Sequence, residues 1–199
     1  HIGVAFDHGK TFRHDAFPEY KAQREETPED IKLSVPIIKD VLAAMNIPIL
    51  QVDGFEADDV IGTLATKAGA EGVETYMLTP DKDYGQLVRS NVYMYKPRHG
   101  GGYDIIGESE IEEKYGIPTP AQVIDLLALM GDSADNFPGC PGVGEKTAVK
   151  LINQFGNIDN MLNHTDELKG KMREKVENAV DDIRMSKFLA TIRTDVPIE

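Results

Sequence analysis

Segments typical of strands and helices alternate over the first half of the chain, and this order limits the fold more than any other feature. Residues 2–6, 47–52 and 73–78 are short apolar runs of the kind found in buried strands. Apolar residues at helical spacing lie between them, over 31–45 and 57–70. A β, α, β, α, β order predicts a mostly parallel sheet with helices on its faces.

The second half of the chain changes character. One more strand is expected at 91–95, followed by a glycine loop at 100–102. Helical patterns then occupy the rest, at 109–115, 119–130, 146–155 and 172–186. We therefore expect an α/β core over residues 1–117 and a helical part over 118–199, forming one compact unit.

The net charge argues against a nucleic-acid partner when taken alone. The 199 residues carry a formal charge of −13, with 34 acidic residues, whereas phosphate binding favours a basic face. Bound divalent cations would neutralise part of this charge. Basic residues also gather locally, before residue 25 and after residue 145.

Cysteine content and hydropathy indicate a cytoplasmic protein. Cys140 is the only cysteine, which excludes an internal disulfide framework and fits a reducing compartment. The longest apolar runs are too short for a membrane span. The first residues lack the pattern of a signal peptide. We expect no membrane partner.

Acidic residues follow the expected strands and one helix at four places. Because carboxyl ends of parallel strands share one edge of a sheet, these carboxylates should converge. Hard cations such as Mg²⁺ prefer oxygen ligands and would relieve the repulsion among them. The members are Asp7, Glu56, Asp58, Asp59, Asp81, Asp83, Asp132 and Asp135.

Each acidic group also has an ordinary structural interpretation. Asp7 could be a turn residue, the acids at 56–59 could cap a helix, and those at 81–83 and 132–135 could close turns. For any single group, a turn or a helix cap explains the acids as well as a metal site does. The presence of all four groups at element ends favours one shared cause. Two-metal phosphodiester hydrolysis supplies one, and scattered histidines argue against zinc.

A glycine-rich hairpin joins two expected helices. Residues 139–148 read GCPGVGEKTA, and glycines allow a backbone to approach a ligand closely. The hairpin opens a helix whose free N–H groups suit a phosphate, and Lys146 adds a positive charge. The spacing of a P-loop is absent. The plain alternative is a tight helix–turn–helix.

Four strings, in order along the chain, resemble one known family. They are residues 54–64 (GFEADDVIGTL), 81–88 (DKDYGQLV), 127–136 (LALMGDSADN) and the hairpin at 139–148. With the opening residues 6–24 and the closing residues 189–195, they are similar to the 5′→3′ exonuclease domain of bacterial DNA polymerase I, within the flap-endonuclease superfamily. The resemblance covers essentially the whole chain.

The resemblance implies a PIN-like α/β core with a helix–hairpin–helix element of the H3TH kind. It implies Mg²⁺ or Mn²⁺, and cleavage of duplex DNA at 5′ flaps, nicks and RNA primers, with a polymerase domain in the parent protein. All eight carboxylates named above would belong to the metal site. Asp7, Lys21 and Arg24 would be catalytic.

The resemblance also implies two DNA-binding regions. One is the arch region, where basic side chains steer the scissile phosphate. The other is the hairpin, which grips the duplex backbone, often with a monovalent cation such as K⁺. The residues that match are Arg13, Tyr20, Lys21, Arg24, Gly142, Gly144, Lys146 and Thr147.

One departure affects the expected activity. Family members begin with a strand that carries an early Asp of the metal site, whereas this sequence starts at His1 in a strand already under way. We expect one strand and one carboxylate to be missing. Unpaired strand edges would invite association. Metal occupancy should be poor and activity weak or absent.

Three alternative functions remain open at this stage. A DNA-binding module without catalysis would use Lys146 and its hairpin, with binding that weakens steeply in salt. A PIN-type ribonuclease toxin fits the acids but not the hairpin. A nucleotide-binding α/β protein fits less well, because no glycine-rich loop follows the first strand.

Overall fold

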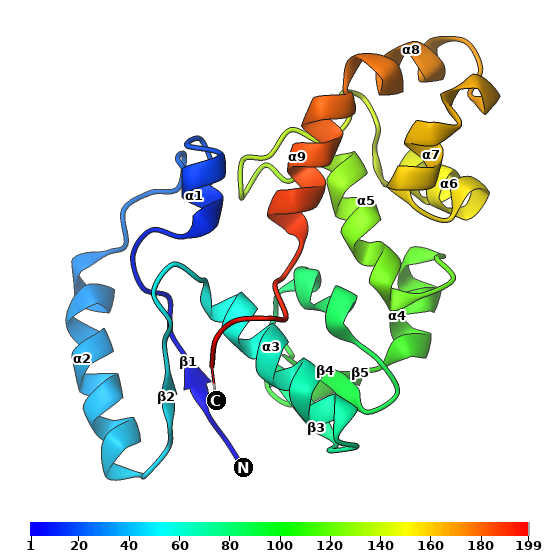
Figure 1. Cartoon of the computed structure of the whole chain (residues 1–199). Coiled ribbons are helices and arrows are strands. Elements are labelled where there is room, and N and C mark those ends of the chain that lie inside the picture. The colour runs from blue at the N-terminus through cyan, green and yellow to red at the C-terminus, as the bar shows by residue number, and fades with distance from the viewer. Residues whose placement is uncertain (199) are drawn as a thin grey trace.

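Two small sheets form the α/β half of the molecule (Figure 1). The computed structural model describes residues 1–198. β1 (Val4–Ala5) pairs in parallel with β2 (Ile49–Leu50). β3 (Thr75–Leu78) pairs in parallel with β4 (Val92–Pro97), which pairs antiparallel with β5 (Tyr103–Ile106). The expected α/β class with parallel pairing is confirmed, although most strands are shorter than expected.

One helix spans both sheets. α3 (Ala57–Ala70) contacts β1 on one side and β3 and β4 on the other. Val60 and Ala65 lie on its buried face, as the apolar spacing predicts. The first turn of α3 therefore lies near the ends of strands from both sheets. This arrangement puts the acidic residues 56–59 at the centre of the α/β half.

The other elements of this half are short, except for one helix. α1 (Phe12–Ala16) and α2 (Glu29–Ala44) precede β2, the 3₁₀ turn η1 (Lys82–Leu87) follows β3, and α4 (Glu108–Tyr115) follows β5. The sequence did not predict α1 or β5. β5 forms because Gly100 to Gly102 all adopt positive φ and let the chain fold back along β4.

The second half is helical, as expected. It contains η2 (Pro120–Gln122), α5 (Val123–Met130), α6 (Glu145–Phe155), α7 (Ile158–Asn163), η3 (Thr165–Glu167), α8 (Lys171–Asn178) and α9 (Val180–Ala190). The helix expected over 172–186 is two helices. The backbone leaves the helical region at Ala179 (φ −111°, ψ 16°), because α8 packs against η3 whereas α9 packs along α5.

The end of the chain ties the two halves together (Figure 1). After α9 it crosses α3 and η1, where the Gln86 side chain donates to the Ala190 carbonyl and accepts from the Ile192 amide. The Val196 amide donates to the Thr63 hydroxyl at 3.0 Å. Buried residues of both halves form one core, and the expected boundary at 117/118 lies between α4 and η2.

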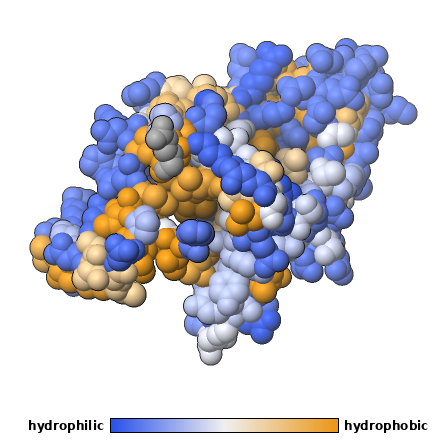
Figure 2. All heavy atoms as spheres, turned by 60° about the horizontal axis from the view of Figure 1, so that its bottom comes forward, coloured by the Kyte–Doolittle hydropathy of each residue, from blue (hydrophilic) through white to orange (hydrophobic). Residues whose placement is uncertain are grey.

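A broad apolar surface faces solvent on the α/β half. α2 buries none of its residues, and most of its large apolar side chains, such as Leu33 and Ile37, are about half exposed or more. Leu78 of β3 and Ile2 are 65% and 67% exposed. Figure 2 shows apolar surface gathered around a hollow on this face. Among the described residues, no strand pairs with the free edges of β1 and β3.

No helix within residues 1–198 combines the length and the apolar character that crossing a membrane requires.

Candidate metal-dependent nuclease site

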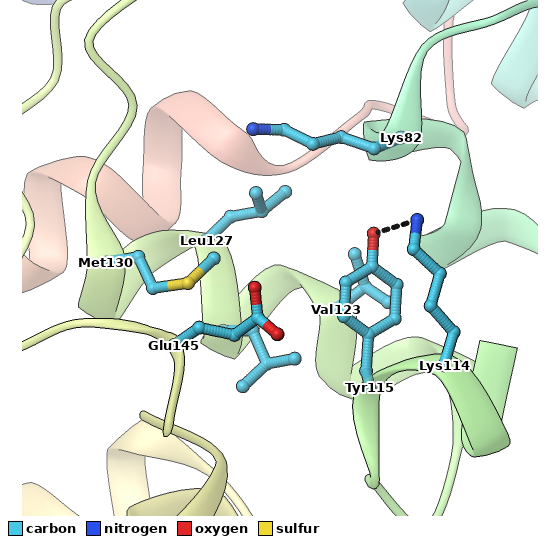
Figure 3. A pocket seen from close by; sticks show the side chains of 8 residues that line it. Lys82, Lys114, Tyr115, Val123, Leu127, Met130 and Glu145 are labelled. Carbon is cyan, nitrogen blue, oxygen red and sulfur yellow. Dashed lines mark hydrogen bonds between the residues drawn. The ribbon is translucent and has the colours of Figure 1, made fainter. Parts of the chain in front are cut away.

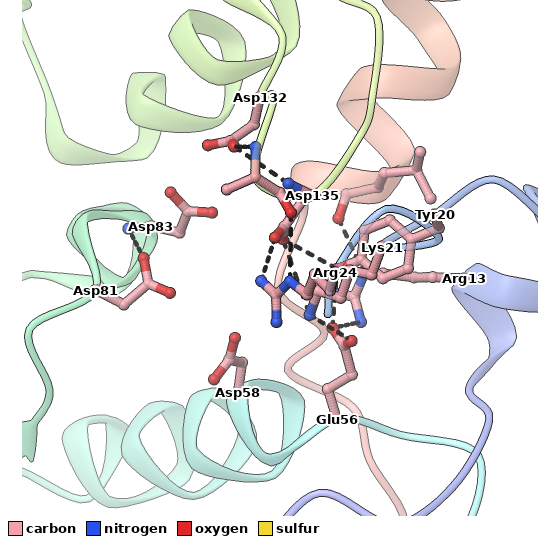
Figure 4. Close-up of polar contacts among 12 residues, drawn as sticks. Arg13, Tyr20, Lys21, Arg24, Glu56, Asp58, Asp81, Asp83, Asp132 and Asp135 are labelled. Carbon is pink, nitrogen blue, oxygen red and sulfur yellow. Dashed lines mark hydrogen bonds and ion pairs between the residues drawn. The ribbon is translucent and has the colours of Figure 1, made fainter. Parts of the chain in front are cut away.

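Four aspartates from three separate segments face a common space (Figure 4). Asp58 lies in the first turn of α3, Asp81 and Asp83 lie at the start of η1, and Asp132 lies in the loop after α5. The sequence predicted this convergence from the positions of the acids at element ends. Asp7 lies at the edge of the group, where its Oδ1 accepts from the Ala57 amide at 2.8 Å and caps α3.

The facing aspartates repel one another. Burial, and then the charge of Asp81, raises the pKa of Asp83 to about 7. Burial also raises the pKa of Asp58 to about 6, although a hydrogen bond from the Tyr84 hydroxyl at 2.6 Å opposes the shift. The Asp83 Oδ1 atom is buried and has no hydrogen-bond partner among the described residues. Among the described residues, Asp58, Asp81 and Asp83 form no ion pair, whereas Asp132 pairs with Lys82.

Asp132 is the exception within the cluster. Burial disfavours its ionised form, but Lys82 donates to its Oδ2 at 2.8 Å and the Ala134 amide donates to its Oδ1 at 2.7 Å. The net result is a pKa below the usual value. Lys82 and Tyr84 were not among the predicted site residues. The position of Lys82 between Asp81 and Asp83 could have indicated its role, whereas only the turn of η1 brings Tyr84 to α3.

The cluster has the chemistry of a hard-cation site, but its ligands are not preassembled. Among residues 1–198, no three Asp, Glu, His or Cys side chains lie close enough together to hold a metal ion as they stand. Facing carboxyl groups, one of them with an unpartnered buried oxygen, nevertheless fit a divalent cation, which prefers oxygen ligands. Mg²⁺ keeps several waters, so only one or two carboxylates need to contact it directly.

A second group of acids is already neutralised by basic side chains (Figure 4). Lys21 Nζ lies 2.7 Å from Glu56 Oε1 and 3.8 Å from Asp135 Oδ2. Arg24 forms an ion pair with Asp135 as well. The Tyr20 hydroxyl donates to Glu56 at 3.1 Å and to Asp135 at 3.3 Å. The expected arch residues Lys21 and Arg24 therefore lie at the expected metal ligands Glu56 and Asp135, and the two groups form ion pairs with each other.

Backbone contacts hold the same basic segment against the loop after α5. The Lys21 amide donates to the Asp135 carbonyl at 3.0 Å, and the Asn136 side chain donates to the Glu19 carbonyl at 2.7 Å. Lys21 adopts a positive φ of 56°, which is uncommon for a residue other than Gly, Asn or Asp. These contacts thus hold Lys21 in an unusual backbone conformation, with its ammonium against Glu56.

Three residues with predicted site roles are buried and make their hydrogen bonds within the protein. Arg13, an expected DNA contact, is 2% exposed and donates to the Asp59 carboxylate through two bonds of 2.7 Å. Tyr20, another expected DNA contact, is 3% exposed. Asp59, an expected metal ligand, is fully buried beneath Arg13. Buried groups with satisfied hydrogen bonds contact neither phosphate nor solvent.

The hairpin connects α5 to α6 as the sequence predicts. Gly142, Gly144 and Lys146 are exposed, and Thr147 is half-buried at the start of α6. Lys175 of α8 lies beside the hairpin, with its Nζ 3.4 Å from the Gly142 carbonyl. Val143 is buried and anchors the turn. Exposed glycines, free helix amides and two lysines thus gather at one place.

A pocket of about 190 Å³ lies beside the acidic cluster (Figure 3). Its walls come from η1, α4, α5 and α6, with apolar residues such as Val123, Leu127 and Met130. Lys114 donates to the Tyr115 hydroxyl at 3.0 Å at its rim. Lys82 borders both the pocket and Asp132, so the pocket adjoins the cluster without containing it.

Two family models match nearly the whole chain. The model described as "5'-3' exonuclease, N-terminal resolvase-like domain" matches residues 1–116, and "5'-3' exonuclease, C-terminal SAM fold" matches residues 118–199. DNA polymerase I of Bacillus caldotenax is 45% identical over the whole of this chain. The chain spans 23% of that polymerase's length.

Solved structures of bacteriophage T5 D15 share the fold. D15 co-crystallised with metal ions is 25% identical, with a TM-score of 0.79 over 96% of this chain and 75% of D15. A D15 flap endonuclease complex with DNA and metal ions is 23% identical, with a TM-score of 0.78 over 96% of this chain and 74% of that one. With both family models matched along its length, this chain belongs to the 5′→3′ exonuclease family of hydrolytic nucleases.

Proposed function

We propose that this chain is a metal-dependent 5′ nuclease that hydrolyses phosphodiester bonds in DNA at 5′ flaps and nicks and at RNA primers. The observation that carries the proposal is the set of Asp58, Asp81, Asp83 and Asp132 around one space, beside Lys21 and Arg24. Carboxylates that need cations, next to basic groups that can bind a phosphate, suit phosphodiester hydrolysis.

The aspartates of the cluster would hold Mg²⁺ or Mn²⁺, with Asp7, Glu56 and Asp135 at its margin. When bound, such ions activate a water and neutralise charge on the phosphate. Lys21 and Arg24 would bind the scissile phosphate once they leave Glu56 and Asp135. Lys82 keeps Asp132 ionised and therefore able to bind a cation.

The hairpin would bind the duplex. Gly144 leaves room for a phosphate, and Lys175 lies against Gly142. The start of α6 offers amides, and Lys146 supplies charge. Thr147 is close enough to the same surface to contribute, and a K⁺ ion could bind the hairpin carbonyls. The DNA and metal ions in the T5 D15 flap endonuclease complex support this assignment by analogy.

The wider setting is proposed from the polymerase relatives. A chain that matches 23% of a bacterial DNA polymerase I is expected to work beside a polymerase domain. Its substrates would then be 5′ ends met during replication and repair in the bacterial cytoplasm.

Cleavage of an end-labelled 5′-flap duplex tests the proposal. With Mg²⁺ or Mn²⁺ we expect weak cleavage that stops on chelation and that Asp132→Ala reduces about 100-fold. Asp104→Ala is the matched control, because Asp104 lies on β5 and pairs only with Arg98 among the described residues. Cleavage that persists in the Asp132→Ala protein would contradict the proposed site.

The second candidate is a DNA-binding module without catalysis. One observation favours it: the carboxylates are not close enough to form a ready metal site. In that case fluorescence anisotropy would detect flap-DNA binding that weakens steeply with salt, with no cleavage at any metal concentration. Lys146→Ala should reduce this binding under both candidates, so cleavage alone separates them.

A further inference from the structure

Arg13 uses every N–H donor of its guanidinium inside the protein. Its Nε donates to the Leu189 carbonyl at 2.9 Å, and one terminal nitrogen donates to the Thr191 carbonyl at 2.7 Å. Both terminal nitrogens donate to the Asp59 carboxylate, at 2.7 Å each. The terminal nitrogen that donates to Asp59 Oδ2 also donates to Glu56 Oε2 at 3.1 Å. With 2% exposure, Arg13 has no donor left for DNA.

Asp59 is saturated in the same way. Its Oδ1 accepts from Arg13 and from the Arg193 amide at 2.8 Å. Its Oδ2 accepts from Arg13 and from the Glu56 amide at 3.0 Å. Two bonds to each oxygen in a fully buried position leave no lone pair directed toward the open space near Asp58.

These bonds join three segments that are distant in sequence. Arg13 belongs to α1, Asp59 and Glu56 begin α3, and Leu189 and Thr191 lie at the end of α9. The planar fork of an arginine fixes both the direction and the rotation of a carboxylate. Glu56 also receives Lys21 on its other oxygen, so its position is set by Arg13 from within and by Lys21 from the solvent side.

We propose that Arg13 is a positioning residue, which holds Glu56 at the metal site and uses Asp59 as its buried anchor. Asp59 then supports the site and does not bind the metal ion. The inference rests on the proposed function, because it assumes that Glu56 contributes to cation binding. Partners of this kind, one step behind the ligands, commonly change metal affinity by about 10- to 100-fold when removed.

The test uses divalent-ion binding as well as activity. Arg13→Lys keeps the charge but loses the fork, so Glu56 and Asp59 are no longer both held. We expect Ca²⁺ affinity, measured by calorimetry, to fall about tenfold. In cleavage assays the metal concentration for half-maximal rate should rise while the KM for flap DNA stays unchanged, because buried Arg13 does not touch DNA.

Two further variants make the result decisive. Arg89→Lys is the matched control, since Arg89 bonds to Thr66 on the far part of α3, and its Ca²⁺ affinity should equal that of the wild type. The double variant Arg13→Met with Asp59→Leu removes both partners of the buried ion pair, a replacement that proteins often tolerate. It should regain the stability that Arg13→Met alone loses, yet still bind Ca²⁺ weakly.

Each outcome decides the matter. Unchanged Ca²⁺ affinity in Arg13→Lys would overturn the inference, and so would a raised KM for DNA at saturating metal. If Arg13→Lys fails to fold, the double variant decides, and a wild-type Ca²⁺ affinity in the double variant would overturn the inference. If the wild-type chain binds no divalent ion, the proposed function itself fails, which distinguishes the two failures.

Discussion

At the scale of single residues, we predict that Lys21 competes with a metal ion for Glu56 and Asp135. Its ammonium lies 2.7 Å from Glu56, and its backbone has a strained φ of 56°. Removing the charge in Lys21→Met should therefore strengthen Ca²⁺ binding by about three- to tenfold, as measured by calorimetry. Lys10→Met is the control, because Lys10 is exposed and has no ion pair within residues 1–198. Weaker binding in Lys21→Met would contradict the competition.

Asp83 predicts how stability depends on pH without metal. Its pKa rises from the usual 3.8 to about 7 on folding, so the folded state binds the proton more tightly. The penalty for its charge is full above pH 7 and disappears as pH falls toward 4. Asp83→Asn should therefore stabilise the chelated protein at pH 8 by up to about 4 kcal/mol, with a smaller gain at pH 5.

Urea unfolding in chelator at both pH values measures this difference. Asp104→Asn is the control: Arg98 lowers the pKa of Asp104, so its charge does not change between pH 8 and pH 5. A gain for Asp83→Asn that is equal at pH 5 and pH 8 would contradict the predicted cause.

At the scale of elements, the end of α5 and the hairpin are in close contact at Gly131 and Gly139. A Cβ at Gly139 (φ 63°) would lie 2.3 Å from the Gly131 nitrogen, a backbone atom that cannot move aside. At Gly144 nothing lies within 4 Å and φ is −96°. Gly139→Ala should cost at least about 3 kcal/mol of unfolding free energy, and Gly144→Ala less than about 1. Similar urea midpoints for the two variants would contradict this.

Some elements follow from local sequence and others do not. The apolar residues of α3 and α5 predict their helices, because α3 buries one face and α5 is buried on nearly all sides. β5 was missed because Tyr103–Ile106 is a strand only by pairing with β4 across the glycine turn. The break at Ala179 was missed because α8 and α9 pack against different neighbours, which no local pattern records.

At the scale of the whole molecule, the separate sheets predict self-association. The free edges of β1 and β3 expose backbone donors and acceptors beside exposed apolar side chains such as Leu78. Sedimentation velocity should show dimers or larger species that grow with concentration. Leu78→Lys, which charges the β3 edge, should reduce them more than Ile31→Lys on the exposed face of α2. Equal effects would indicate general apolar contact.

The sequence by itself determined the class of fold, the family and the group of acids, because these depend on periodicity and on motifs that are local in the chain. It placed Asp58, Asp81, Asp83 and Asp132 at element ends, and the structure gathers them in one space. Only the tertiary structure decided what each charge contacts. Arg13 and Asp59 look like a phosphate contact and a metal ligand in the sequence, yet α1, α3 and the end of α9 enclose them as a pair. Burial and long-range contacts pair Arg13 with Asp59, and the spacing of neighbouring residues encodes neither.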